Sequence, residues 1–187
     1  MASRKRKIAF ETLEAPVRSN YFHGMLLGER DFQREQDYFR NKVRLALRLA
    51  HGWGIVSGLE VSVSQGQVVV APGVAIDCRG QDLVVPVMQK LPLAGPRGKR
   101  YVTLRLHEEP IEPVPIPGEN EASVAYAATR ESARVELVTV DPLAGHGRFR
   151  PRDRGCGVAH ALAIATVSCS GAKWRVTATP GLRARRK

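Results

Sequence analysis

The sequence lacks the features that place a protein in or across a membrane. No uninterrupted apolar run approaches the roughly 18 residues that a membrane-spanning helix needs. The first seven residues, Met1 to Lys7, include four basic side chains and no apolar stretch of the kind that signal peptides carry. We therefore expect synthesis in the cytoplasm without a signal peptide, and no membrane span.

Cysteine is also scarce. The three cysteines, Cys78, Cys156 and Cys169, are far apart and form no C-x-x-C pair. An odd number at such spacings excludes a disulfide framework and a zinc ribbon as the basis of the fold. We expect the three thiols to be reduced and mostly buried, and we expect no metal and no cofactor.

Positive charge is abundant but unevenly placed. The net charge is +11, of which residues 1–7 and 183–187 carry eight and residues 148–154 a net three. The remaining body is therefore about neutral. Basic ends of this kind stay solvated or meet an acidic partner, which can be a protein surface, a lipid headgroup or a nucleic acid backbone.

The chain length of 187 residues, of which 43% are apolar, fits one domain with one core. Residues 1–27 are interpreted as a basic tail and an extended docking arm, residues 28–180 as one helix-plus-β domain, and residues 181–187 as a basic tail. From Glu29 to Ala50 there is no Gly or Pro, and apolar residues recur at helical spacing. The sequence predicts one long amphipathic helix there, which Gly52 ends as a left-handed cap.

After Gly54 the pattern changes to alternation and β-branched runs. About eight short strands are expected, at residues 59–63, 68–70, 74–76, 83–87, 101–106, 135–140, 162–167 and 174–177. The predicted fold is α+β and mainly β, an antiparallel sandwich or partly open barrel, with the helix packed on one face or end. Two long connections are predicted: an acidic, proline-rich, extended loop from Glu108 to Ser123 and a basic loop from Asp141 to Gly157.

Several patterns suggest chemistry, but each has a simpler structural interpretation. The run Gly52-Trp53-Gly54 with Gly58 follows a helix and precedes a strand, which is the reverse of a dinucleotide-binding turn. Cys156 and His160 make only half of a metal site. Trp53 is expected in the core.

Asp77 and Asp82 flank Cys78-Arg79-Gly80-Gln81, and two carboxylates can act as acid and base. The favoured interpretation is a hairpin, in which Asp77 hydrogen-bonds the turn backbone, Gly80 has positive φ, and residues 74–76 pair with 83–85. In that case Asp77→Asn lowers stability by about 1 kcal/mol. An acid–base enzyme that uses this pair stays open as a third hypothesis.

Five segments in this order resemble a bacterial domain found in gene clusters of phage-tail-like contractile injection systems. They are Tyr21-Phe22-His23-Gly24-Met25-Leu26-Leu27, Asp31-Phe32-Gln33-Arg34-Glu35-Gln36-Asp37-Tyr38, His51-Gly52-Trp53-Gly54-Ile55-Val56-Ser57-Gly58-Leu59, Pro72 to Pro86, and Tyr101 to Pro110. The resemblance covers about residues 20–140. It implies a baseplate-associated or cap-adaptor component with no catalytic residues, and it leaves open the position in the particle and whether the particle is cytoplasmic, membrane-anchored or released.

The leading hypothesis is thus a non-enzymatic subunit, present in several copies, that docks through its termini and long loops onto neighbouring baseplate, tube or sheath proteins of the same particle. The alternative is a nucleic-acid-binding protein that uses its tails and the segment 148–154. The residues expected to contact partners are Arg4, Lys5, Arg6, Lys7, Tyr21, Phe22, Arg148, Arg150, Arg152, Arg154, Arg183, Arg185, Arg186 and Lys187.

Overall fold

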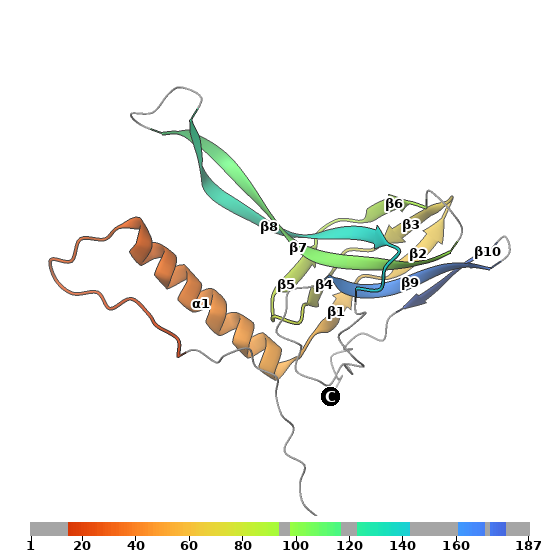
Figure 1. Ribbon diagram of the computed structural model, residues 1–187, viewed down its shortest axis with the longest axis horizontal. Coiled ribbons are helices and arrows are strands. Elements are labelled where there is room, and N and C mark those ends of the chain that lie inside the picture. The colour runs from red at the N-terminus through yellow and green to blue at the C-terminus, as the bar shows by residue number, and fades with distance from the viewer. Residues whose placement is uncertain (1–14, 94–97, 117–122, 143–160, 171–172, 179–187) are drawn as a thin grey trace, which may run out of the picture.

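The computed structural model describes residues 15–93, 98–116, 123–142, 161–170 and 173–178, which form one helix and ten strands (Figure 1). All strand pairs are antiparallel. In chain order the elements are α1 (Glu29–Ala50), β1 (Gly54–Gly58), β2 (Val61–Ser64), β3 (Gln67–Val70), β4 (Gly73–Ile76), β5 (Asp82–Val85), β6 (Gln89–Pro92), β7 (Lys99–Pro115), β8 (Val124–Val138), β9 (Leu162–Ser170) and β10 (Lys173–Ala178).

The helix has the predicted bounds and the predicted ends. Its first turn carries Glu29 and Asp31, and the Asp31 carboxylate accepts a hydrogen bond from the Gly28 N–H at 3.0 Å. Acidic groups here complement the positive end of the helix dipole. At the other end Gly52 has φ +82°, and its N–H donates to the Leu47 and Arg48 carbonyls. The left-handed glycine cap is confirmed.

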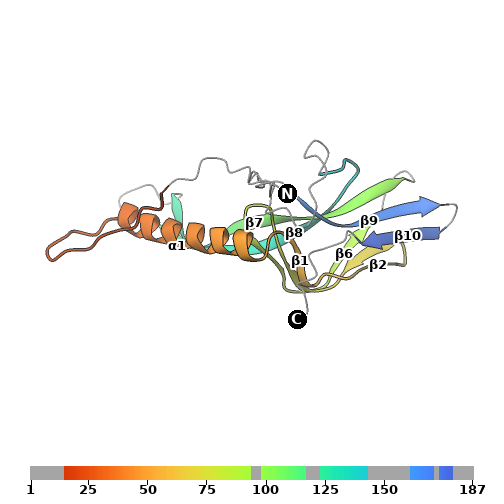
Figure 2. The same ribbon diagram turned by 90° about the horizontal axis from the view of Figure 1, so that it is seen from below.

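The strands form three sheets around one core. The four-stranded sheet has the order β10-β9-β7-β8, and the two three-stranded sheets have the orders β1-β4-β5 and β2-β3-β6. In Figure 2, β7 and β9 lie above the layer that contains β1 and β2. Buried side chains from all three sheets, among them Val68, Leu83, Val102 and Ile164, pack into a single cluster, which also contains Trp53 as predicted.

The predicted fold class, mainly β with one helix and antiparallel sheets, is confirmed, and the sheets do not close into a barrel. The prediction that the helix packs on the β body is wrong for most of its length. None of the residues of α1 is buried, and the helix projects beyond the sheets (Figures 1 and 2). An amphipathic pattern shows that a helix has an apolar face but not which molecule covers that face.

The acidic connection predicted between Glu108 and Ser123 is also different in the structure. Its backbone is extended, as predicted, but β7 continues to Pro115 and β8 begins at Val124. The two strands pair along this length, so a hairpin replaces most of the predicted loop. Prolines are tolerated because only β8 pairs with this part of β7, which is an edge position where a missing N–H costs little.

The turn between β4 and β5 joins the helix to the β body. Asp77 Oδ1 accepts hydrogen bonds from the N–H groups of Arg79 and Gln81, each at 2.8 Å. With the Gln81 amide nitrogen turned toward Asp77 Oδ2, at 2.9 Å, its amide oxygen accepts from Arg44 Nη2 of α1, also at 2.9 Å. Backbone contact is closest at Gly80, where an added Cβ atom would lie 2.0 Å from the Arg44 carbonyl oxygen. The β4–β5 turn is therefore the place where α1 contacts the β body.

We expect Gly80→Ala to lower the free energy of unfolding, measured by urea denaturation, by about 2 kcal/mol or more. The added methyl group meets backbone rather than a flexible side chain, and Gly80 also has φ +84°. Gly66→Ala is the matched control, since Gly66 has φ +71° but no atom within 4 Å of its added Cβ. It carries only the left-handed backbone penalty of about 1 kcal/mol. Equal losses in the two variants would contradict a close contact between turn and helix.

Candidate protein-interaction site

Of the residues predicted to contact partners, the structure describes Tyr21 and Phe22, and both are exposed. They lie on the segment that precedes α1. The other predicted residues lie outside the described residues: Arg4, Lys5, Arg6, Lys7, Arg148, Arg150, Arg152, Arg154, Arg183, Arg185, Arg186 and Lys187.

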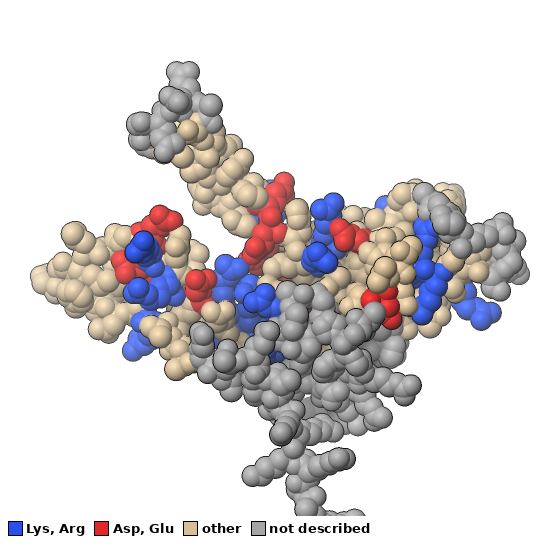
Figure 3. Space-filling view, viewed as in Figure 1, with Lys and Arg blue, Asp and Glu red and all other residues tan. Residues whose placement is uncertain are grey.

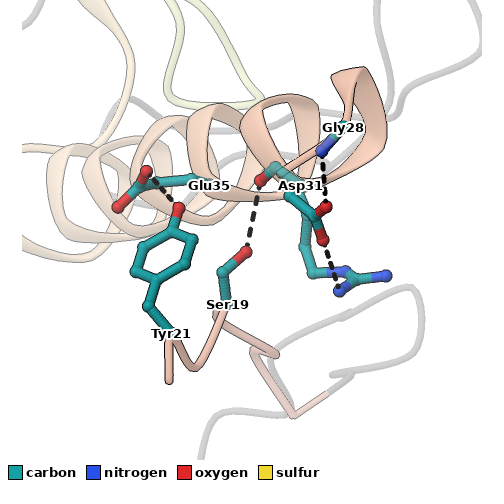
Figure 4. A network of polar contacts seen from close by, with 6 residues as sticks. Ser19, Tyr21, Gly28, Asp31 and Glu35 are labelled. Carbon is teal, nitrogen blue, oxygen red and sulfur yellow. Dashed lines mark hydrogen bonds and ion pairs between the residues drawn. The ribbon is translucent and has the colours of Figure 1, made fainter. Parts of the chain in front are cut away.

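The segment before α1 folds back along the helix and is held there by polar contacts (Figure 4). The Ser19 hydroxyl donates to the Asp31 carbonyl oxygen at 3.2 Å, and the Tyr21 hydroxyl donates to Glu35 Oε2 at 2.6 Å. The hydrogen bond to the Glu35 carboxylate raises the pKa of Tyr21 above its usual value. These bonds fix the segment on one side of the helix.

A tight turn then places apolar side chains at the free end of the helix. The Met25 N–H donates to the Phe22 carbonyl at 3.1 Å, and Gly24 between them has φ +85°. The residues Phe22, Leu26 and Leu27, which we call the helix tip, are all exposed, Leu26 to 93%. Exposed apolar residues gathered at one end of a molecule are typical of a contact surface.

The outer part of the β7–β8 hairpin, residues 108–115 and 124–131, is a second protrusion, which we call the arm. It leaves the body on the same side as α1 (Figure 1). None of its residues is buried, and Tyr126 is 56% exposed. Tyr126 pairs with Pro113 and Val124 with Pro115, so these four lie on one face. In Figure 3 the visible face of the arm is free of charged side chains between its acidic root and its grey end.

The root of the arm contacts the helix through charged groups. Arg40 Nη2 lies 3.0 Å from Glu108 Oε1 and 3.7 Å from Glu131 Oε1. The two glutamates are cross-strand partners in the β7–β8 register. Because all three side chains are partly exposed, each pair contributes little alone, on the order of 0.5 kcal/mol. The contact nevertheless connects α1 to the arm.

The two carboxylates considered as an acid–base pair, Asp77 and Asp82, belong to the β4–β5 hairpin in the structure. Asp77 is buried, whereas Asp82 is exposed. Gly80 has φ +84°, and residues 74–76 pair with 82–84, as β4 and β5. The hairpin interpretation is confirmed, but the pairing is shifted by one residue from the predicted partner, residues 83–85. Within the described ranges no group of three His, Cys, Asp or Glu side chains is placed to hold a metal ion.

The described helix, α1, is not apolar enough to cross a membrane. Cys78 is buried and Cys169 is partly buried, as expected of mostly buried cysteines, and Cys156 lies outside the described residues.

The long connection from Glu108 to Ser123 was expected to dock, but neither the apolar face of the arm nor the apolar face of α1 was recognised as a candidate site from the sequence. The signal for the arm was present, since Ile111, Val114, Val124 and Tyr126 are apolar residues on either side of a short polar segment. The surrounding glutamates and prolines hid it, because they are typical of loops.

The sequence matches no protein-family model and no curated protein. The fold is similar to that of a chain in the TssK-TssF-TssG baseplate subcomplex of the type VI secretion system, with a TM-score of 0.51 and 13% identity over 87% of this chain. A crystal structure of TssK and the baseplate complex of the type VI secretion system match with TM-scores of 0.49 and 0.48, at 15% and 14% identity. The chain spans 60%, 41% and 58% of the length of these three structures, respectively, and 87 to 88% of its own length is covered.

We expect Asp77→Asn to lower the free energy of unfolding at pH 7 by about 1 kcal/mol, because the amide keeps one acceptor oxygen but loses the second, which accepts from the Gln81 amide nitrogen. Burial raises the pKa of Asp77, against the opposing effect of the turn N–H groups. A raised carboxyl pKa means that the folded protein binds the proton more tightly than the unfolded chain. The free energy of unfolding of the native protein, compared with that of Asp77→Asn, therefore increases as pH falls. The increase occurs between the raised pKa of Asp77 in the folded protein and its usual pKa in the unfolded chain.

The measurement is urea denaturation of both proteins between pH 7 and pH 4. Asp82→Asn serves as the control because Asp82 is exposed, and we expect its stability to stay within about 0.5 kcal/mol of the native protein. A native advantage that shrinks as pH falls would show that the turn holds Asp77 mainly as an anion.

Proposed function

We propose that this chain is a non-enzymatic structural subunit of a phage-tail-like contractile injection particle, located in or beside the baseplate. The observation that carries this proposal is the likeness in fold to a chain of the type VI TssK-TssF-TssG baseplate subcomplex, over 87% of the present chain. The sequence resemblance to components of contractile injection systems supports it independently, because that resemblance depends on the order of short motifs rather than on the fold.

The two protrusions support a docking role. Both the helix tip and the arm carry large apolar side chains that nothing described in the chain covers. Exposed apolar area of this kind costs free energy in water and is recovered when a partner buries it, at about 25 cal/mol per Å². Such surfaces are retained in proteins whose working state is an assembly.

The residues first considered for catalysis have structural tasks. Asp77 organises the β4–β5 turn, Trp53 belongs to the core, and Gly52 ends α1. These structural roles account for the three residues without a catalytic function. Partners are therefore expected to be other structural proteins of the particle, bound through the helix tip, the arm and the basic segments.

Affinity purification of the tagged full chain from its native host, followed by mass spectrometry, tests this proposal. We expect sheath, tube or baseplate proteins in the eluate, with rod-shaped particles in negative-stain images. Tyr126→Glu places a charge on the apolar face of the arm and is expected to reduce the recovery of one neighbouring protein by about tenfold or more. Ser62→Glu is the matched control, because it adds the same charge at an exposed strand position of the body.

Recovery of the lone protein with nucleic acid would overturn the proposal. It would favour the alternative that the basic segments bind nucleic acid, which then requires affinity that falls steeply with salt concentration. Equal loss of particle proteins with both variants would show that the arm is not a docking surface.

A further inference from the structure

One face of α1 carries apolar residues that no described part of the chain covers. Phe32, Phe39 and Val43 are all more than half exposed, Phe39 to 58%. Gln36, Ala46 and Ala50 lie on the same face and are exposed as well. We call these six positions the seam.

The described surroundings of the helix leave the seam open. The segment before α1 lies against Asp31 and Glu35, which are half-buried, and the β4–β5 turn lies against Arg44. At 100° per residue Asp31 and Arg44 fall on other faces of the helix, and Glu35 lies at the edge of the seam. The contacts that hold the helix in place therefore do not use its most apolar face.

The spacing of the seam is that of a coiled coil. Its positions, 32, 36, 39, 43, 46 and 50, alternate by four and three residues over the whole helix. Successive steps of four and three are the heptad pattern, which keeps one narrow face turned to a partner helix of the same kind. The seam is about 27 Å long at 1.5 Å per residue. Such a face fits another helix better than it fits a sheet or a loop.

The charges beside the seam identify the partner as a second copy of this chain. Glu35 flanks the seam on one side and Arg40 on the other, five residues apart. In a parallel pair of identical helices, the residues at these two flanking positions face each other across the interface. Glu35 of each copy then lies opposite Arg40 of the other. Arg40 is exposed and Glu35 is half-buried, so neither is fully buried before the pair forms.

We propose that α1 is a self-association helix, whose seam packs against the seam of a second copy of this chain in a parallel coiled coil. The proposal does not depend on the particle assignment above. It leaves the contact of α1 with the β4–β5 turn in place, and Figure 2 shows that the helix projects beyond the sheets. Parallel packing puts the arms of both copies at the same end of the assembly.

Sedimentation velocity of the purified full chain at several concentrations tests the association. We expect the mass to rise with concentration from 20.5 kDa to twice this value. Phe39→Glu and Val43→Glu are expected to weaken association about tenfold or more, since each puts a charge into the seam. Asn41→Glu adds the same charge on another face of α1 and is expected to change nothing.

Gln36→Leu tests the seam in the opposite direction. Replacing the polar seam residue with leucine is expected to strengthen association by about tenfold, a gain that damaged folding does not produce. A monomer at all concentrations for the native chain and for Gln36→Leu would overturn the proposal and assign the seam to a different protein. Equal weakening by Asn41→Glu and Val43→Glu would also overturn it.

A charge exchange tests the parallel arrangement. Glu35→Lys and Arg40→Glu each place like charges across the seam in homomeric pairs, so each variant alone is expected to associate more weakly than the native chain. A mixture of the two restores opposite charges at both contacts and is expected to recover association. Arg40→Glu also removes the contact to the arm, and Glu35→Lys removes the hydrogen bond from Tyr21. Each of these losses occurs within one copy whether or not that copy is paired, so the mixture changes only the contacts across the seam. Failure of the mixture to recover would exclude the parallel pairing.

Discussion

The position of the helix depends on one buried carboxylate. Asp77 accepts hydrogen bonds from two N–H groups of the β4–β5 turn, and the Gln81 side chain of this turn accepts a hydrogen bond from Arg44 of α1. Burial of the charged group is costly, and the turn N–H groups offset part of this cost. The same turn brings Gly80 so close to the helix backbone that no side chain fits between them. The β4–β5 turn thus also sets the direction in which α1 leaves the body.

The molecule divides its tasks between a compact part and two protrusions. Three sheets share one buried cluster, which gives the body its stability. The helix and the arm add little to that cluster and expose large apolar residues instead. Neither protrusion has to fold alone. The arm continues β7 and β8 of the four-stranded sheet, and α1 is attached to the body near its C-terminal end.

The sequence was informative where local chemistry decides the structure. Helix α1 was predicted with its correct bounds because acidic residues, an uninterrupted helical run and Gly52 all agree on them. The β4–β5 hairpin followed from Asp77 and Gly80 in the same way. Strands β1 and β6 were missed, since β1 begins and ends with glycine and β6 ends in proline, and such residues are more typical of turns.

Long-range placement was harder to predict. The apolar face of α1 indicated burial, but periodicity does not distinguish burial within a chain from burial between chains. The arm was predicted as an acidic loop because its prolines and glutamates dominate the local signal, whereas pairing with β8 depends on residues nine or more positions away. Of the candidate site, only Tyr21 and Phe22 were anticipated among the residues that the structure describes.

The paired glutamates at the root of the arm make the two protrusions sensitive to each other. Glu108 and Glu131 face each other across the hairpin, where like charges repel, and Arg40 of α1 neutralises part of that repulsion. Any binding event that draws Arg40 away therefore raises the electrostatic energy of the hairpin at its base. Since the three groups are in contact with water, dissolved salt weakens this mutual influence. The strength of the contact between helix and arm therefore depends on the ionic strength of the solution.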